Sequence, residues 1–344
     1  MKEGNPNTRR ALAAQLEGGA RAYGAGAAER LSELANVSGS FTGWLDCFTQ
    51  RVMELSVAVL LDEPAVLSHG FAWASAGLEA RDIEAPDSRT QLEAMRQSLR
   101  EDLGEQAWSL VDPMLGSVDL DRAPALEAGA RLRNDGGYQS QAVRYLELTL
   151  EGRWREGISE LVDAQRAGAS LRELYERVLL PAAAEMGTMW HLGEISVSEE
   201  HAATEAILSA MSVLWHEAET SPPNGRRVVV GSVTSDLHSI GVRAAAWLLE
   251  QSGCMTACMG SDLPEPDFVH AAVGYDADSV VIGATLATHL PRAMDTIASI
   301  RRERPETRVI VGGPAFGIAP GLGARVGADA TASGPGETPE LVLS

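Results

Sequence analysis

Basic residues are scarce in this sequence of 344 residues, and lysine is almost missing from it. Lys2 is its single lysine, and 28 lysine and arginine residues stand against 48 aspartate and glutamate residues, which gives a net charge of −20. Both 1–140 and 141–344 share this deficit. Because binding to a nucleic-acid backbone needs a basic surface, we expect no nucleic-acid partner.

Long hydrophobic runs and cysteines are also rare. No apolar stretch reaches 18 residues, and the first residues, MKEGNPNTRR, lack the apolar segment of a signal peptide. Cys47, Cys254 and Cys258 are too few for a framework of disulfides. A composition of 45% hydrophobic and 22% charged residues is typical of a folded protein. We therefore expect a soluble cytoplasmic protein without a membrane segment.

The first part of the chain, 1–117, predicts an all-helical domain. Alanine, leucine, glutamate and arginine dominate it, and β-branched residues are few. The lengths of its helices would also suit a globin-like fold. The apolar spacing predicts helices over 8–36, 40–61, 64–80 and 88–111.

The middle of the chain contains a predicted linker over 118–138 and a predicted helical bundle over 139–220. Proline, aspartate and a Gly-Gly pair mark the linker. In the bundle, Ser170–Glu173 and Ser196–Glu199 both fit the capping box that begins a helix. Gly193 is expected to end the helix between them. Three or four packed helices would account for this region.

The last part, 221–344, changes to short β-branched runs that alternate with amphipathic stretches. This alternation predicts a parallel sheet with helices on both faces, and its size fits a flavodoxin-like, Rossmann-type α/β domain. The chain as a whole is therefore predicted to be multidomain. In such sheets ligands bind beyond the carboxyl ends of the strands. The predicted strands cover 227–233, 255–259, 279–285, 308–312 and 328–333.

The loop after the first predicted strand carries Asp236 and His238, followed by Gly241. A histidine at this edge points into the ligand crevice, and the aspartate can bond its far ring nitrogen and so fix the tautomer. The glycine lets the next helix begin close to a ligand. The alternative is a simple helix start, in which Asp236 is the cap and His238 is exposed.

This loop resembles the cobalamin-binding fingerprint Asp-x-His-x-x-Gly. Two further elements of that family have counterparts at matching spacing: Ala284–Leu286 stands for its Ser-x-Leu, and Gly312–Gly313 stands for its Gly-Gly pair. Ala284 departs from the family's serine, and Thr285 or Thr288 would replace the missing hydroxyl. The resemblance implies base-off binding, in which the dimethylbenzimidazole tail leaves cobalt and enters the domain.

The resemblance also implies roles for individual residues. His238 would be the lower axial ligand of cobalt, with Asp236 behind it. Small residues, Gly283 among them, would line the slot for the tail. Apart from the resemblance, the place of His289 after the third predicted strand, on the ligand side of the sheet, makes it a candidate for a corrin contact, and a histidine without that contact is the alternative. The cofactor-binding residues in this domain would be Asp236, His238, Gly241, Ala284, Thr285, Leu286, Gly312 and Gly313.

In the helical bundle, Trp190 is followed after nine residues by Glu200 and His201. This pattern resembles the Trp-x9-Glu-His signature of CarH-type adenosylcobalamin photoreceptors, whose four-helix cap covers the upper corrin face. The resemblance implies that Trp190 lies against the adenosyl group, that Glu200 bonds it and that His201 faces the same pocket. His191 would bind cobalt after photolysis. The alternative is a core tryptophan with surface histidines.

The expected function is light sensing rather than catalysis, because an indole above the corrin leaves no room for a substrate. Loss of the adenosyl group would shift the cap, so we expect a homo-oligomer that changes with light. The cobalamin fingerprint is equally typical of a corrinoid protein that carries methyl groups for methyltransferases, and this is the alternative function. A third possibility is an adaptor that docks an unidentified effector protein.

The N-terminal helices predict a second chromophore. CarH-type repressors have a DNA-binding domain here, and this chain shows no such recognition pattern. An all-helical module in this place resembles the photocobilins, which add biliverdin, and we expect non-covalent binding. His69, with Phe71 and Trp73, would line the tetrapyrrole pocket, and the alternative is a ligand-free bundle with His69 in its core. The arginines proposed to pair with its propionates are Arg9, Arg10, Arg51 and Arg96.

Overall fold

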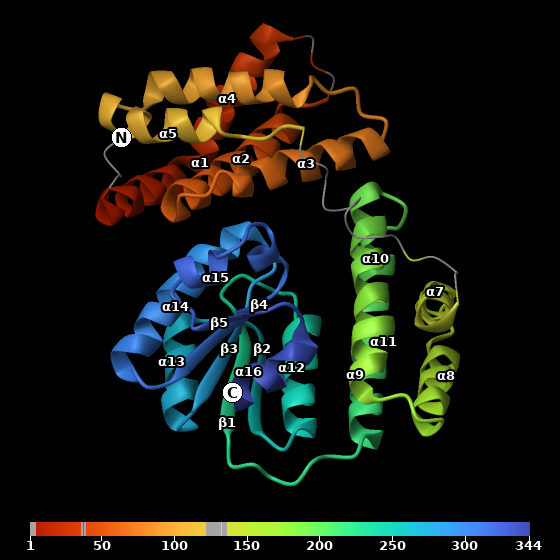
Figure 1. Cartoon of the computed structure of the whole chain (residues 1–344). Helices are drawn as coiled ribbons and strands as arrows, with labels where there is room; N and C mark the ends of the chain where they lie inside the picture. Colours follow the sequence, from red (N-terminus) through yellow and green to blue (C-terminus); the bar gives the residue numbers. More distant parts are fainter. Residues whose placement is uncertain (1–4, 36, 38, 122–131, 133–135) are drawn as a thin grey trace. The chain divides into compact units, whose positions relative to one another are not determined.

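A computed structural model describes residues 5–35, 37, 39–121, 132 and 136–344. The chain divides into two compact units, Met1–Ala130 and Arg131–Ser344, which are considered separately (Figure 1). Most of the predicted linker over 118–138 lies outside the described residues. Among the residues that are described, no helix combines the length and the apolar character needed to cross a membrane.

The first unit is helical in its described part, as its composition predicts. It contains α1 (Pro6–Leu34), α2 (Phe41–Leu61), α3 (Ala65–Ala80), α4 (Ser88–Asp102) and α5 (Glu105–Gly116). The single predicted helix over 88–111 is wrong, because Leu103 adopts an extended conformation and separates α4 from α5. Pro113 lies inside α5. A globin-like arrangement stays a prediction.

The second unit begins with the predicted helical bundle. It contains α7 (Gly137–Leu150), α8 (Trp154–Arg166), the uninterrupted run of α9 (Leu171–Leu174), the π-helix η1 (Tyr175–Leu179) and α10 (Leu180–Leu192), and then α11 (Val197–Glu217). Both capping boxes are formed, at Ser170–Glu173 and at Ser196–Glu199. Gly193 ends α10 in the left-handed conformation with φ 77°, as predicted.

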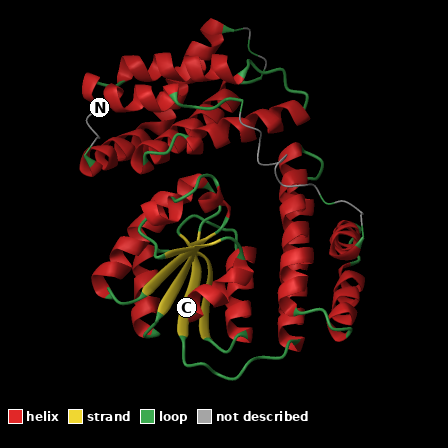
Figure 2. Ribbon diagram, viewed as in Figure 1, coloured by secondary structure: helices red, strands yellow, loops and turns green. Residues whose placement is uncertain are grey.

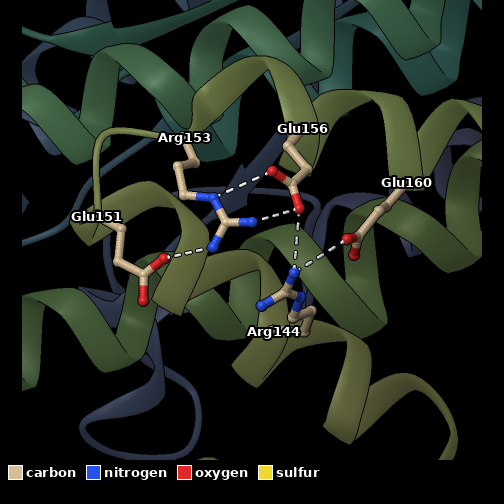
Figure 3. Close-up of polar contacts among 5 residues, drawn as sticks. All are labelled: Arg144, Glu151, Arg153, Glu156 and Glu160. Atoms are coloured by element: carbon tan, nitrogen blue, oxygen red, sulfur yellow. Dashed lines mark hydrogen bonds and ion pairs between the residues drawn. The ribbon is translucent and has the colours of Figure 1, made fainter.

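Exposed ion pairs connect α7 with α8 on the surface of the bundle (Figure 3). Arg144 contacts Glu156 at 3.3 Å and Glu160 at 3.4 Å, and Arg153 contacts Glu151 and the same Glu156. Each of these side chains is substantially exposed, so water screens the pairs and each adds little to stability. The buried apolar side chains of the bundle therefore provide most of its stabilisation.

A five-stranded parallel sheet in the order β2-β1-β3-β4-β5 forms the rest of the second unit, with helices on both faces (Figure 2). Its strands are β1 (Arg227–Val233), β2 (Met255–Leu263), β3 (Ser279–Gly283), β4 (Arg308–Gly312) and β5 (Ala330–Ala332). Its helices are α12 (Ile240–Gln251), α13 (Glu265–Gly274), α14 (Leu290–Glu303), α15 (Leu322–Arg325) and α16 (Thr338–Leu343). The predicted α/β class is thus confirmed.

Some predicted strand ends are wrong. The edge strand β2 continues to Leu263 across a register shift near Gly260, where polar residues hide the strand from a hydrophobicity pattern. The other edge strand, β5, is shorter than predicted. The inner strand β1 pairs with both β2 and β3, so the strand order reverses beside β1, and ligands of such sheets bind at the carboxyl edge there.

Aromatic side chains hold the bundle against the α/β domain. Trp215 of α11 stacks on Trp247 of α12, with ring centroids 5.6 Å apart, and Tyr175 of η1 lies 6.4 Å from the same Trp247. Ala244 and Leu248 of α12 belong to the core of the bundle. The two parts of this unit therefore share one continuous core.

Candidate functional site

The loops that follow β1 and β3 meet at the carboxyl edge of the sheet. Asp236, after β1, is fully buried, and its Oδ1 lies 2.8 Å from Nδ1 of His238. The backbone N–H of His238 donates to the same oxygen at 3.2 Å. The other oxygen, Oδ2, accepts from the backbone N–H of Thr285 at 2.8 Å. The predicted Asp236–His238 pair is formed, and the second loop holds it.

The local backbone sets the aspartate in place. Ser235 has φ 70°, and its N–H donates to Asp262 at 2.6 Å. Ser232 of β1 donates through its hydroxyl to the carbonyl of Asp236 at 2.8 Å. Asp236 does not cap α12, which begins after Ser239 without a side-chain cap. The alternative of a simple capped helix is therefore wrong.

The electrostatics of the pair favour a negative aspartate beside a basic imidazole. Burial is the largest single effect and opposes ionisation of Asp236, yet His238 and His289 together outweigh it and lower the pKa of the carboxyl far below its ordinary value. The bond to Asp236 raises the pKa of His238 against the effect of burial, and the charge of Glu200 raises it further. The side chain of His238 is 59% exposed. Since Nδ1 bonds the aspartate, Nε2 is the nitrogen that can bind a metal.

Two glycines at this edge, Gly283 and Gly313, have neighbours that leave no room for a side chain. A Cβ atom on Gly283 would clash with Val242 of α12. One on Gly313, where φ is 110°, would clash with the carbonyl of Ala284. By contrast, a Cβ on Gly241 would meet nothing within 4 Å. The prediction that Gly283 and Gly313 line a slot for the nucleotide tail stays a prediction, and Gly241 lies beside open space.

The remaining predicted residues of this domain differ in exposure. Leu286 is 48% exposed, whereas Ala284 is buried and Gly312 is only partly buried. His289, expected to contact the corrin, is buried instead and lies 3.4 Å from Asp236. The sequence offers no signal for this contact, because the pairing of β1 with β3 creates it.

The predicted cap residues lie at the junction of α10 and α11. Trp190 is 42% exposed, while Met186 of the same helix is in the bundle core, so the alternative of a core tryptophan is wrong. Glu200 lies 2.7 Å from Nδ1 of His201 and accepts from Thr204 at 2.9 Å. Glu200 also acts on His238 electrostatically, so the start of α11 belongs to the same site as the β1 loop.

His191 and His201 differ in their surroundings. His201 is exposed, with 74% of its side chain accessible, and His191 is partly buried. The predicted roles of both histidines toward a ligand stay predictions, as do those of Trp190 and Glu200.

The predicted bilin residues of the first unit come from several helices. His69, Phe71 and Trp73 lie on α3, and the arginines lie on α1, α2 and α4. His69 stacks on Trp73 with ring centroids 6.3 Å apart, but Phe71 is buried. Several of the arginines expected to hold propionates already pair with carboxylates. These pairs are Arg9 with Asp62 at 2.8 Å, Arg51 with Glu54 at 2.8 Å and Arg96 with Asp112 at 2.5 Å. Biliverdin binding stays a prediction.

Comparison with protein-family models matches residues 226–343 to a B12 binding domain. Residues 144–214 match a second model, also described as a B12 binding domain. The chain carries B12-binding domains. The Asp236–His238 pair and the loop with Thr285 lie in the first of them, and Trp190 and Glu200 lie in the second.

Similar proteins include dimethylamine corrinoid protein 3 of Methanosarcina acetivorans, 28% identical over 162 residues that cover 46% of this chain and 76% of that protein. The HTH-type transcriptional repressor CarH of Myxococcus xanthus is 24% identical over 217 residues, which cover 54% of this chain and 72% of CarH. The B12-binding domains are thus homologous both to corrinoid proteins of methanogens and to CarH.

Among solved structures, the monomethylamine corrinoid protein of Methanosarcina barkeri has a TM-score of 0.52 and 20% identity, and the match covers 60% of this chain and 99% of that one. This likeness shows that the B12-binding domains have the corrinoid-protein fold, a helical part followed by a parallel α/β part.

Proposed function

We propose that residues 131–344 bind a corrinoid whose cobalt is held from below by Nε2 of His238. The observation that carries this proposal is the 2.8 Å contact between Nδ1 of His238 and the buried carboxylate of Asp236. Such a carboxylate fixes the tautomer and makes the far nitrogen a better metal ligand. In the part of the chain that the structure describes, no three His, Cys, Asp or Glu side chains form a metal site alone. One protein ligand suits a metal whose corrin ring supplies the equatorial nitrogens.

The surroundings of His238 fit a large, flat and mostly apolar ligand. Leu237 is 73% exposed and Leu286 is 48% exposed, so both loops that meet at this edge offer apolar surface. The open space above Gly241 lets a ligand approach the start of α12. Because His238 would occupy the lower position on cobalt, the nucleotide base of the cofactor would be displaced. The bound corrinoid supplies a reactive cobalt–carbon bond.

The relatives support a methyl carrier as the use of this corrinoid. The corrinoid proteins of Methanosarcina match this chain at 25–28% identity in the dimethylamine group, against 24% for CarH. In this use the chain holds the corrinoid with its upper face toward a partner methyltransferase and does not catalyse the transfer alone. Because of this similarity, the methyl carrier is the first candidate function.

A light sensor that binds adenosylcobalamin is the second candidate, and Trp190 favours it. Its side chain is 42% exposed in the last turn of α10, and the charge of Glu200, at the start of α11, raises the pKa of His238. In this use Trp190 would cover the upper ligand of the corrinoid, whose cobalt–carbon bond would supply the light-sensitive chemistry, and His191 would be the residue that holds cobalt after light. The resulting shift of α10 would change a homo-oligomer or the contact with an effector protein. Similarity to CarH over 217 residues supports this use.

The test of corrinoid binding is reconstitution of the full chain with aquocobalamin in the dark. We expect an absorption spectrum of base-off cobalamin with an imidazole ligand, and loss of that signature in His238→Ala. The matched control is His216→Ala, since His216 is an exposed histidine at the far end of α11. A His238→Ala protein with the wild-type spectrum and affinity would contradict the proposal.

Light separates the two uses. A sensor loaded with adenosylcobalamin bleaches under green light and changes its scattering mass without any other protein. A carrier loaded with methylcobalamin gives up its methyl group only when a methyltransferase is added. An unchanged scattering mass after complete photolysis would contradict the light-sensor function.

Biliverdin binding by the N-terminal helices is a separate proposal, supported by the stacked rings of His69 and Trp73. Co-expression with a haem oxygenase should give a protein that absorbs red light and loses its colour on denaturation and extraction. His69→Ala should weaken the colour more than a surface change such as Ser109→Ala does. A colourless product from the full chain would contradict this proposal.

A further inference from the structure

His289 lies behind Asp236, on the side opposite to His238 in the hydrogen-bond network. It ends η2 (Ala287–His289), directly before α14, and is only 6% exposed. Its Nδ1 accepts from the backbone N–H of Leu286 at 3.2 Å and lies 3.4 Å from Oδ2 of Asp236. One ring nitrogen therefore faces a hydrogen-bond donor and a negative acceptor together.

These two neighbours make opposite demands on Nδ1. The backbone N–H of Leu286 always carries its proton, so Nδ1 must offer a lone pair to it. A proton on Nδ1 would instead point to Asp236 and leave the partly buried N–H of Leu286 without this acceptor, which costs free energy. Asp236 already receives the N–H of Thr285 on the same oxygen. The neutral ring of His289 therefore carries its proton on Nε2.

We propose that His289 is a positioning residue for the cobalt ligand His238. By accepting from Leu286, its ring fixes the turn after β3. This places the N–H of the preceding residue, Thr285, on Oδ2 of Asp236. Oδ1 of the oriented carboxylate then holds Nδ1 of His238. The proposal rests on the proposed corrinoid function, since it concerns how His238 is aimed.

The distances and burial support this order of contacts. Asp236 and His289 are both buried, and hydrogen bonds in such a low-dielectric place are strong and directional. Thr285 and Leu286 are consecutive, so holding one N–H restricts the rotation of the peptide that carries the other. His238 itself is mostly exposed and depends on Asp236 for its orientation.

Two polar variants of similar size test the proposal in the full chain. In His289→Asn the amide oxygen lies as many bonds from Cα as Nδ1 does and can accept from Leu286. In His289→Gln the amide lies one bond further out. The probe is cobinamide, which lacks a nucleotide base, so an imidazole ligand on its cobalt comes from the protein.

The readouts are the absorption spectrum and the nitrogen splitting in the EPR spectrum of the cobalt(II) form. We expect His289→Asn to keep the imidazole-ligated signature, and His289→Gln to lose most of it with affinity about 10-fold weaker. Equal behaviour of the two variants, whether both match the wild type or both lose the signature, would overturn the proposal.

A measurement on the unsubstituted chain decides the matter if a variant fails to fold. With ¹⁵N-labelled histidine, NMR should show His289 protonated on Nε2, and a ring protonated on Nδ1 would overturn the proposal. These outcomes differ from failure of the proposed function. If His238→Ala leaves the corrinoid spectrum unchanged, His238 is not the cobalt ligand and the proposed function is wrong. If His238→Ala abolishes the imidazole signature while His289→Asn and His289→Gln give the same spectrum as each other, only the role of His289 is wrong.

Discussion

The backbone N–H of Thr285 donates to Oδ2 of Asp236 at 2.8 Å, although the two residues are 49 positions apart in the chain. This bond joins the loop after β3 to the loop after β1, which are adjacent because β1 pairs with β3. It leaves Oδ1 of Asp236 for His238. The aspartate is thus held on one oxygen and acts on the imidazole with the other.

Replacing Asp236 by asparagine should weaken the cobalt ligand without removing it. An amide carries no charge, and it has one acceptor oxygen where Asp236 uses two. We expect corrinoid affinity to fall about 10- to 100-fold, measured by titration with aquocobalamin. Asp262→Asn is the matched control, since its Oδ1 can still accept from Ser235. Equal affinities of the two variants would contradict this role.

Two glycine-to-alanine changes at the same edge should have opposite effects. Gly313→Ala should lower the free energy of unfolding by about 1–3 kcal/mol, because φ is 110° and the new Cβ meets the carbonyl of Ala284. Gly241→Ala should leave stability unchanged or slightly raised, because nothing lies within 4 Å. It should nevertheless weaken corrinoid binding. Urea unfolding and cobalamin titration of both variants check this, and a destabilised Gly241→Ala protein would refute it.

Removing the exposed indole tests the sensor. If Trp190 covers the upper ligand, Trp190→Ala should reduce the preference for adenosylcobalamin over methylcobalamin, as measured by competitive binding in the dark. Val213→Ala, an exposed apolar change further along α11, should leave the preference intact. A wild-type protein that binds both cobalamins equally would count against the adenosyl contact.

His191 is predicted to bind cobalt after photolysis. It follows Trp190 directly, so the two side chains point about 100° apart around α10, and the helix must shift to bring the imidazole to the metal. His191→Ala should still bleach under green light but should fail to hold a spectrum with two imidazole ligands. Should the variant keep the light-state spectrum of the wild type, another residue is the ligand.

The stability of the α/β domain should depend on pH through Asp329, beside β5. Burial opposes its ionisation, but hydrogen bonds from Arg301 and from the N–H of Val309 outweigh burial and lower the pKa below 3.8. A lowered pKa stabilises the folded state above 3.8 and loses this effect as the pH falls through the lowered value. The difference in melting temperature between wild type and Asp329→Asn should therefore shrink in acid. A constant difference down to pH 2 would exclude this linkage.

Local features of this protein can be predicted from its sequence. The capping boxes at Ser170–Glu173 and Ser196–Glu199 and the pairing of Asp236 with His238 involve residues two or three apart, so the chain alone brings them together. The buried strands β1 and β3 each contain a short apolar run, Val228–Val230 and Val280–Ile282. Edge strands are not, which explains why the length of β2 was mispredicted.

The rest of the site depends on which strands and helices pack together. Thr285 meets Asp236, His289 lies behind it, and Glu200 acts on His238 only because the fold places these separate elements at one edge of the sheet. Glycine is required at 283 and 313 because Val242 and Ala284, which come from other parts of the chain, approach these positions closely. The sequence determines which groups carry the chemistry, whereas burial and strand order decide which of them touch, because those contacts join residues far apart in the chain.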